Sequence, residues 1–336
     1  MHFTKRFLSI ISVLSVMVCL PSCEEMDLPI GNKQDIVFFS DEVTFDGGRF
    51  ENYKPDEPGY SIQPSCFEVI GGKWYALEYK AYRSWTDVNL LVNGEKKATI
   101  LKGCLSVQNA VAYVQNGRFK AYIFYFDADD NYHGIHYDDG KTEEIEGLTD
   151  FERILMVRTV KNDVYAVWNL DVHNFYEVGN IVITKNDKPV EQSLTLPAGT
   201  SVWYFRDLFI DGSTIYSFLT LHKDGINKAY YAKDNELVRM NGLEDVCCGQ
   251  VVGSKVYGLG IVHDDDQKSR YWEDGKTTKI LPESAPVSPR GLAVDKGSVY
   301  YLVTDYSSRP CTSVLFKDGV EYTRQEKELT GFKIIH

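Results

Sequence analysis

A unit of about 45 residues recurs six times along this sequence, and every copy carries the same two anchors. The first anchor is an apolar residue followed by tyrosine. The second is a turn dipeptide that begins with Asn or Asp and ends 18 to 22 residues after the tyrosine. The first anchors are Trp74-Tyr75, Ala121-Tyr122, Val164-Tyr165, Ile215-Tyr216, Val256-Tyr257 and Val299-Tyr300, and the second are Asn93-Gly94, Asp139-Gly140, Asn186-Asp187, Asp234-Asn235, Asp274-Gly275 and Asp318-Gly319.

Each unit reads as four short strands joined by turns. Asn-Gly and Asp-Gly favour tight hairpins, because both central residues of a type I′ turn need positive φ. No amphipathic helical stretch of ordinary length interrupts the series. One four-stranded sheet cannot bury both of its faces, so neighbouring copies must stack, and closing them into a ring removes long exposed edges. The sequence therefore predicts an all-β chain folded as a β-propeller.

The number of blades depends on how the two ends of the chain are used. Six copies predict six four-stranded blades, which is the arrangement we expect. The alternative is a seventh blade split between the N- and C-termini, because 35–39 and 42–45 look like strands without an inner partner and 331–336 looks like an inner strand. In both cases 35–336 forms a single propeller domain.

The amino end carries export features. Lys5 and Arg6 precede an apolar run at 7–20, which at 14 residues is shorter than the about 20 needed to span a bilayer. Leu20-Pro21-Ser22-Cys23 resembles a bacterial lipobox, so 1–22 is interpreted as a signal peptide, Cys23 as the acylated residue and 23–34 as a lipidated tether. The alternative is an ordinary signal peptide with a chance cysteine at its end. Acidic residues directly after Cys23 are similar to the surface-export signal of Bacteroidota lipoproteins, which implies outer-membrane anchoring at the cell surface.

The repeat itself resembles that of uncharacterised β-propeller lipoproteins of Bacteroidota. The likeness lies in the recurring Val-Tyr pairs and in Tyr-Trp-x-Asp-Gly, which stands here as 271–275. The likeness covers nearly the whole mature chain, but it concerns the repeat architecture alone. Because propellers host both binding modules and unrelated enzymes, it implies no activity.

Charge and motifs exclude several functions. The net charge is -12, and it becomes about -14 once Lys5 and Arg6 leave with the signal, which argues against nucleic acid or anionic lipid as a partner. The chain has no G-x-S-x-G, H-E-x-x-H or phosphate-binding loop, so we assign no catalytic residue, metal or cofactor. Asp127, Asp129 and Asn131 alternate as calcium ligands do, but Tyr132 replaces the expected glycine and a solvated loop is the preferred interpretation.

Loop lengths predict which rim of the ring is functional. Tight turns join the first strand to the second and the third to the fourth, so they share one rim, and longer loops and crossovers lie on the other. Binding residues concentrate on long loops held by a rigid scaffold. Aromatic side chains there offer apolar area to a sugar ring or a partner protein. The candidates are Trp85, Tyr132, Tyr176 and Trp203.

Two arginines occupy the same slot of the repeat near the expected channel mouth. Arg206 and Arg290 each lie ten residues before the tyrosine of their copy, where the fifth copy has Cys247 and the first has Ser65. Inner strands begin at the long-loop rim, so both guanidinium groups should reach the mouth and bind a carboxylate of an acidic sugar or peptide. The alternative is that each arginine pairs with an acidic neighbour, such as Asp207 or Glu283.

These features favour a membrane-anchored, non-enzymatic binding propeller for a glycan, peptide or partner protein on the long-loop face, with the membrane reached through the lipid only. One alternative is a polysaccharide-active enzyme whose carboxylates converge at the propeller centre. Another is a structural subunit of an outer-membrane complex.

Overall fold

The computed structural model describes residues 35–47, 49–55, 59–149, 151–172, 178–190, 196–262, 268–279, 287–307 and 309–336. Every regular element in these residues is a β-strand. In this part of the chain there is no helix long and apolar enough to cross a membrane.

Six four-stranded antiparallel sheets follow one another along the chain, each with its strands in sequence order. Blades one and two are β3 (Tyr60–Ile70), β4 (Lys73–Ala81), β5 (Thr86–Val92) and β6 (Glu95–Cys104), then β7 (Ser106–Gln115), β8 (Arg118–Phe126), β9 (Tyr132–Asp138) and β10 (Lys141–Glu144). Blades three and four are β11 (Arg153–Val160), β12 (Asp163–Leu170), β13 (Asn180–Lys185) and β14 (Lys188–Pro189), then β15 (Ser201–Asp211), β16 (Thr214–Lys223), β17 (Ile226–Lys233) and β18 (Glu236–Arg239). Blades five and six are β19 (Asp245–Val252), β20 (Lys255–Val262), β21 (Lys268–Glu273) and β22 (Lys276–Lys279), then β23 (Val287–Asp295), β24 (Ser298–Asp305), β25 (Thr312–Lys317) and β26 (Val320–Gln325).

A seventh blade closes the ring, so the expectation of six blades is wrong and the split-blade alternative is correct. β1 (Asp35–Phe39) pairs with β2 (Val43–Asp46) on one side and with β27 (Gly331–Ile335) on the other, all antiparallel. A single bridge from Val43 to Tyr53 extends this sheet outward. Both chain ends are needed because β27 supplies the inner strand that β1 lacks.

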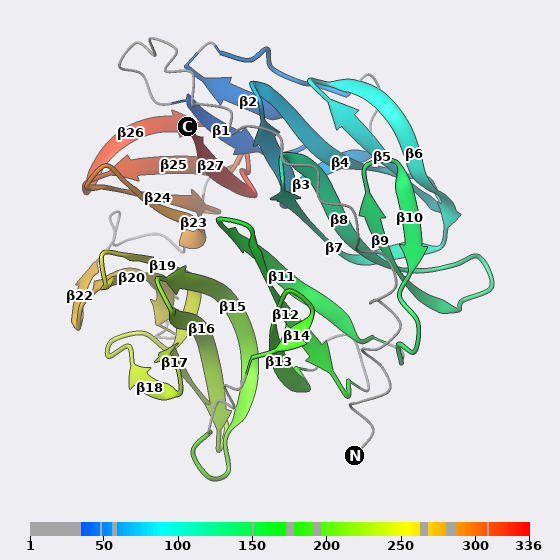
Figure 1. Cartoon of the computed structure of the whole chain (residues 1–336). Helices are drawn as coiled ribbons and strands as arrows, with labels where there is room; N and C mark the ends of the chain where they lie inside the picture. Colours follow the sequence, from blue (N-terminus) through cyan, green and yellow to red (C-terminus); the bar gives the residue numbers. More distant parts are fainter. Residues whose placement is uncertain are drawn as a thin grey trace.

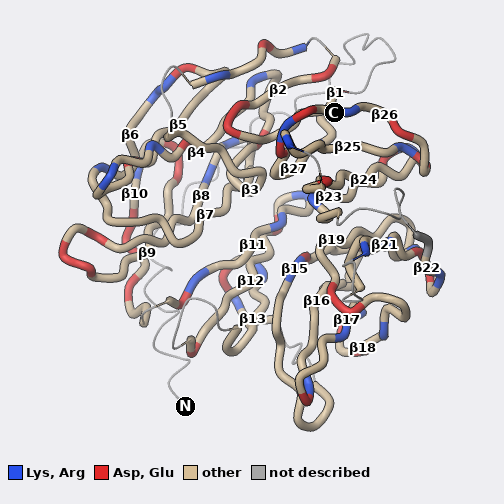
Figure 2. The backbone as a smooth tube through the Cα atoms, turned by 180° about the vertical axis from the view of Figure 1, so that it is seen from behind, with Lys and Arg blue, Asp and Glu red and all other residues tan. Residues whose placement is uncertain are grey.

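The seven sheets stand radially around one axis (Figure 1). Each inner strand contacts the next around the full circle, including β27 with β23 and with β3. The hydrophobic core lies between blades: Leu77 and Val88 of blade one, for example, pack with Ile123 of blade two. Seen from behind, basic and acidic positions are spread over all parts of the ring (Figure 2).

The two sequence anchors contact each other in five of the six complete blades. The first residue of the third-to-fourth turn accepts the N–H of the apolar residue before the tyrosine, and its own N–H donates to that residue's carbonyl. The pairs are Asn93 with Trp74, Asn186 with Val164, Asp234 with Ile215, Asp274 with Val256 and Asp318 with Val299. Blade two departs because β8 begins two residues earlier relative to its tyrosine. The paired positive φ angles predicted for the Asn-Gly and Asp-Gly turns are confirmed, for example 49° at Asn93 and 82° at Gly94, whereas in the Asp234-Asn235 turn only Asp234 has a positive φ.

Turn and loop placement follows from this topology. The tight turns after each inner strand and after each third strand share one rim, and the crossovers between blades lie on the long-loop rim. β27 runs toward the tight-turn rim like every inner strand. Since Asp35 pairs with Ile335, β1 also enters the ring from the tight-turn rim.

Candidate functional site

The inner strand of every complete blade contains a break in register with its second strand. In β15, β19 and β23 the skipped residues are Arg206, Cys247 and Arg290. A bulge leaves one residue without a cross-strand partner and re-aims its side chain, which is why bulges are common beside functional sites. The repeat slot identified in the sequence is therefore a β-bulge, and three consecutive blades present it side by side.

Arg206 is not paired with its acidic neighbour. Asp207 instead contacts Arg158 of β11, with 2.7 Å between a carboxylate oxygen and Nη2. The guanidinium of Arg206 lies over Tyr204, 3.9 Å from the ring centroid. Its Nε is buried and has no hydrogen-bond partner among the residues that the structure describes. Arg206 thus has no ion-pair partner among the carboxylates of this part of the chain.

Arg290 is held by a different acid from those expected. Its Nη2 contacts the carboxylate of Glu328 and the hydroxyl of Tyr306, and Tyr306 donates to Glu328 at 2.6 Å. Glu283 lies outside the described residues. Glu328 belongs to the crossover from β26 to β27, so the ring-closing segment positions this arginine.

Cys247 connects the two arginines electrostatically. Burial raises the pKa of its thiol to about 11, while Arg206 and Arg290 both act to lower the pKa. The strand order agrees with this, because β19 lies between β15, which carries Arg206, and β23, which carries Arg290. The thiol is neutral at physiological pH, so the charge at this place comes from the arginines. Asp245 also acts on the Cys247 pKa, but it is buried and accepts a hydrogen bond from Asn227.

Aromatic side chains extend the surface beside Arg206. Trp203 is 45% exposed and lies against Tyr204 and against His222, whose ring centroid is 4.9 Å away. We call this group the mouth cluster: Trp203, Tyr204, Arg206, Cys247, Arg290, Tyr306 and Glu328.

The other predicted site residues lie elsewhere. Trp85 stands beside Tyr82 on blade one. Tyr132 packs on Phe126 and Phe151 and donates to the carbonyl of Glu152 at 2.8 Å, which gives it a structural role. Tyr176 and the lipidation residue Cys23 lie outside the described residues.

The acidic loop between β8 and β9 is organised by its own donors. The carboxylate of Asp127 accepts the N–H groups of Asp129 and Asn131, each at 2.9 Å, and contacts Nε2 of His133 at 2.9 Å. These bonds explain the alternating spacing as a turn. Within the described ranges, no group of three or more His, Cys, Asp or Glu side chains is placed to hold a metal ion.

Sequence reasoning missed Tyr204, Glu328 and the partner of Asp207. Tyr204 could have been predicted from the sequence, because residues two apart in a strand share a face and Arg206 follows at that spacing. Glu328 and Arg158 could not have been predicted from the sequence. Each contacts a residue 38 or more positions away, and their proximity depends on the geometry of the ring.

Comparisons with known proteins show the fold alone. No family model matches the chain, and no curated protein matches it. A puromycin-hydrolysing peptidase of Mycobacterium tuberculosis is similar over 76% of this chain and 44% of its own length, at 10% identity and a TM-score of 0.51. Prolyl endopeptidases are similar at 12% identity and a TM-score of 0.43, over 81% of this chain and 44% of theirs. The propeller domain of the trilobed protease of Pyrococcus furiosus is similar at 14% identity and a TM-score of 0.39, over 80% of this chain and 96% of its own length. The chain thus spans less than half the length of the first two proteins.

Proposed function

We propose that this chain is a lipid-anchored binding propeller that captures an anionic ligand, a carboxylate of an acidic glycan or peptide, at the mouth cluster. The observation that carries this proposal is the arrangement of three adjacent bulges, which bring Arg206 and Arg290 to either side of Cys247. Arginine presents a planar fork of donors that matches a carboxylate. Arg206 has no acidic partner among the described residues, so its guanidinium can bind the carboxylate of a ligand.

Binding is favoured over polysaccharide hydrolysis by the ion pairs of three inner-strand carboxylates. Asp207 is paired with Arg158, Glu68 with Lys333 and Asp295 with His336. Arg158 and Lys333 belong to other inner strands, and His336 directly follows the inner strand β27. These pairs link neighbouring blades. A glycoside hydrolase instead needs two carboxylates free to act on one bond.

Anchoring at Cys23 is part of the proposal, and the strand order supports a particular orientation. β1 enters the ring from the tight-turn rim, so an anchor at Cys23 favours an orientation with that rim toward the membrane. The mouth cluster, on inner strands near the long-loop rim, then faces away from the membrane. Cys23→Ala should give an exported chain without acylation, as checked by fractionation and by mass spectrometry of the mature amino terminus. A wild-type amino terminus away from residue 23 contradicts this anchoring.

Binding is tested by calorimetric titration with D-glucuronate and with short oligogalacturonides, with glucose as the neutral comparison. Arg206→Ala should weaken binding of the acidic probes about tenfold to a hundredfold, since a hydrogen bond to a charged group contributes about 1.5–3 kcal/mol. Arg324→Ala is the matched control, because Arg324 is an exposed arginine of β26 paired with Glu321. Equal affinity in wild type and Arg206→Ala, or no affinity for any acidic probe, refutes the proposed ligand class.

A further inference from the structure

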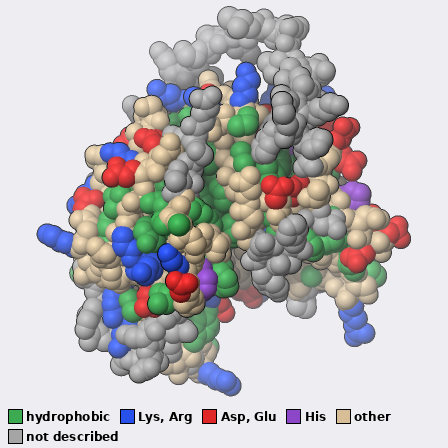
Figure 3. Space-filling model, turned by 90° about the horizontal axis from the view of Figure 1, so that it is seen from below, with side chains coloured by type: hydrophobic (Ala, Val, Ile, Leu, Met, Phe, Trp, Pro, Cys, Tyr) green, Lys and Arg blue, Asp and Glu red, His purple; other side chains and the backbone are tan. Residues whose placement is uncertain are grey.

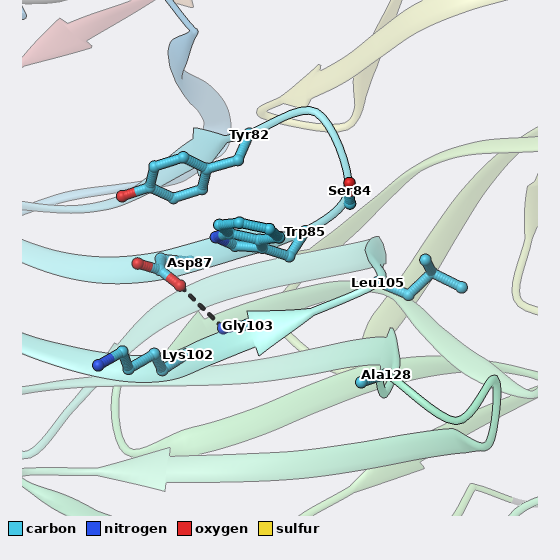
Figure 4. Close-up of a pocket in the computed structure, with 8 residues that line it drawn as sticks. All are labelled: Tyr82, Ser84, Trp85, Asp87, Lys102, Gly103, Leu105 and Ala128. Carbon is cyan, nitrogen blue, oxygen red and sulfur yellow. Dashed lines mark hydrogen bonds between the residues drawn. The ribbon is translucent and has the colours of Figure 1, made fainter.

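A cavity of about 530 Å³ lies between blades one and two at the long-loop rim, outside the mouth cluster (Figure 4). Blade one supplies most of its lining: Tyr82 and Trp85 from the β4–β5 loop, Asp87 from β5 and Lys102 from β6. The crossover to β7 supplies Leu105, and the β8–β9 loop of blade two supplies Ala128. This volume lies in the range of small-ligand sites, about 300–1,000 Å³.

Two aromatic rings form one wall of the cavity and remain open to solvent. Tyr82 is 41% exposed and Trp85 47%, and their ring centroids lie 5.2 Å apart at 31°. The loop is fixed in this shape, because Tyr82 N–H donates to the carbonyl of Trp85 at 2.7 Å and the ammonium of Lys80 lies 5.2 Å from the Tyr82 ring centroid. The two rings are therefore packed on each other, and the outer ring face forms a platform that needs little ordering before it binds a ligand.

Polar groups of both signs stand beside the platform. One carboxylate oxygen of Asp87 accepts the N–H of Gly103 at 2.8 Å, which orients the side chain and leaves its second oxygen for a ligand. Lys102 lines the same cavity from the neighbouring strand. Figure 4 shows the Trp85 ring above Asp87, with Lys102 below it. The cavity thus combines an apolar face with one hydrogen-bond acceptor and one donor.

We infer that this cavity binds a neutral hexopyranose residue of a glycan. A pyranose ring has an apolar C–H face that fits an aromatic ring, and hydroxyl groups at its edge that both donate and accept. An anionic ligand would lie against Asp87 and a cationic one against Lys102, whereas a neutral sugar uses both groups. An apolar peptide side chain would leave both charges unsatisfied.

This site differs from the mouth cluster in place and chemistry. It lies on blades one and two, whereas the mouth cluster lies on blades four to six and on the crossover that follows. Space-filling Figure 3 shows a face on which hydrophobic side chains reach the surface among scattered charges, so an exposed ring alone does not identify a site. The distinguishing feature is a cavity that joins paired rings to oriented polar groups.

The test is titration of the folded mature chain with the methyl α-pyranosides of glucose, galactose and mannose, followed by tryptophan fluorescence and ligand-observed NMR. At least one should bind saturably. Trp85→Ala should weaken that binding about tenfold or more, and Asp87→Asn, which keeps the acceptor for Gly103 but removes the charge, should weaken it severalfold. Tyr322→Ala is the control, because it removes a comparably exposed ring, 44%, from the outer strand β26.

Thermal unfolding of each variant verifies that its fold is intact. Saturable binding lost in Trp85→Ala and kept in Tyr322→Ala supports the inference. Absence of binding by all three sugars at millimolar concentration, or an unchanged Kd in Trp85→Ala, overturns it. Neither result bears on the acidic probes, which report on the mouth cluster separately.

Discussion

Asp274 and Val256 hold each other across a blade through two hydrogen bonds. The Asp274 carboxylate accepts the Val256 N–H at 2.9 Å, and the Asp274 N–H donates to the Val256 carbonyl at 3.1 Å. These residues are the two anchors of the repeat. In the five blades that form this pair, the nearly constant spacing between anchors thus reflects a closed hydrogen-bonded ring.

Loss of the side-chain bond should be measurable. Asp274→Ala should lower the free energy of unfolding by about 1 kcal/mol more than Asp139→Ala. Asp139 is the matched control, since its φ of 48° is close to the 41° of Asp274 but its blade lacks the anchor pair. Chemical denaturation measures both. Equal losses would show that the cost is backbone strain alone.

Gly275 isolates the backbone part of the same turn. Its φ is +87°, and a Cβ added there would meet no atom within 4 Å, so the only penalty is conformational. Gly275→Val should cost about 1 kcal/mol or more, because a β-branched residue is strained at positive φ. Gly275→Asn should cost less, since Asn tolerates this region. Thermal unfolding of the pair checks the assignment, and an unchanged Tm in Gly275→Val contradicts it.

Two histidines of β9 should titrate on opposite sides of the ordinary value, about 6.5. Hydrogen bonds to Asp127 and Glu144 raise the pKa of His133. Burial lowers the pKa of His136, helped by Lys120, and the Tyr113 hydroxyl lies 2.9 Å from its Nε2. Proton NMR titration of the ring signals, assigned with His133→Gln and His136→Gln, measures both values.

The signs of the stability effects follow from those shifts. The His133 contribution is present below about pH 6.5 and is lost as pH rises through the raised folded pKa. The His136 contribution runs the other way: the folded state loses stability as pH falls below about 6.5, because the unfolded chain takes up the proton more readily. The side chain of His133 is 28% exposed and that of its partner Glu144 68%, so solvent screens the interaction and the contribution is small. Shifts in the same direction for both rings would contradict the structure.

Glu328→Gln should strengthen binding of acidic ligands at the mouth cluster. Glu328 occupies Arg290 and accepts from Tyr306, so its charge competes with an incoming carboxylate. Gln keeps the acceptor oxygen and removes the competing charge. Calorimetry with D-glucuronate should show a lower Kd, and the difference should shrink as salt is added. Weaker binding in Glu328→Gln would indicate that Glu328 positions Arg290 for the ligand instead.

The fold was largely predictable because its signals are local. Asn93-Gly94 and its counterparts fix turns within a few residues, and the apolar-Tyr pairs mark buried second strands. The number of blades was not predictable in the same way. The segment 331–335 carries neither anchor, and no local pattern relates it to 35–39 at the other end of the chain.

The candidate sites were predictable in part. Counting back from Tyr216 and Tyr300 identified the shared slot of Arg206 and Arg290, because the repeat preserves position within a strand. The ion pairs around that slot were not predictable, since Arg158 reaches it from blade three and Glu328 from the β26–β27 crossover. Trp85 was identified as exposed, but its cavity depends on Lys102 and Leu105 of a later segment.

The seam of blade seven makes the order of synthesis matter. Six blades can each form from consecutive strands, whereas β1 receives its inner neighbour only when residues 331–335 have been made. Until then Ile36, Val37 and Phe39, which have no exposed surface in the finished ring, lie on a strand with an open edge. Unpaired apolar edges are what chaperones and proteases encounter in unfinished chains. Arrival of β27 is therefore the event that removes this exposed edge, and a chain cut short before residue 331 retains it.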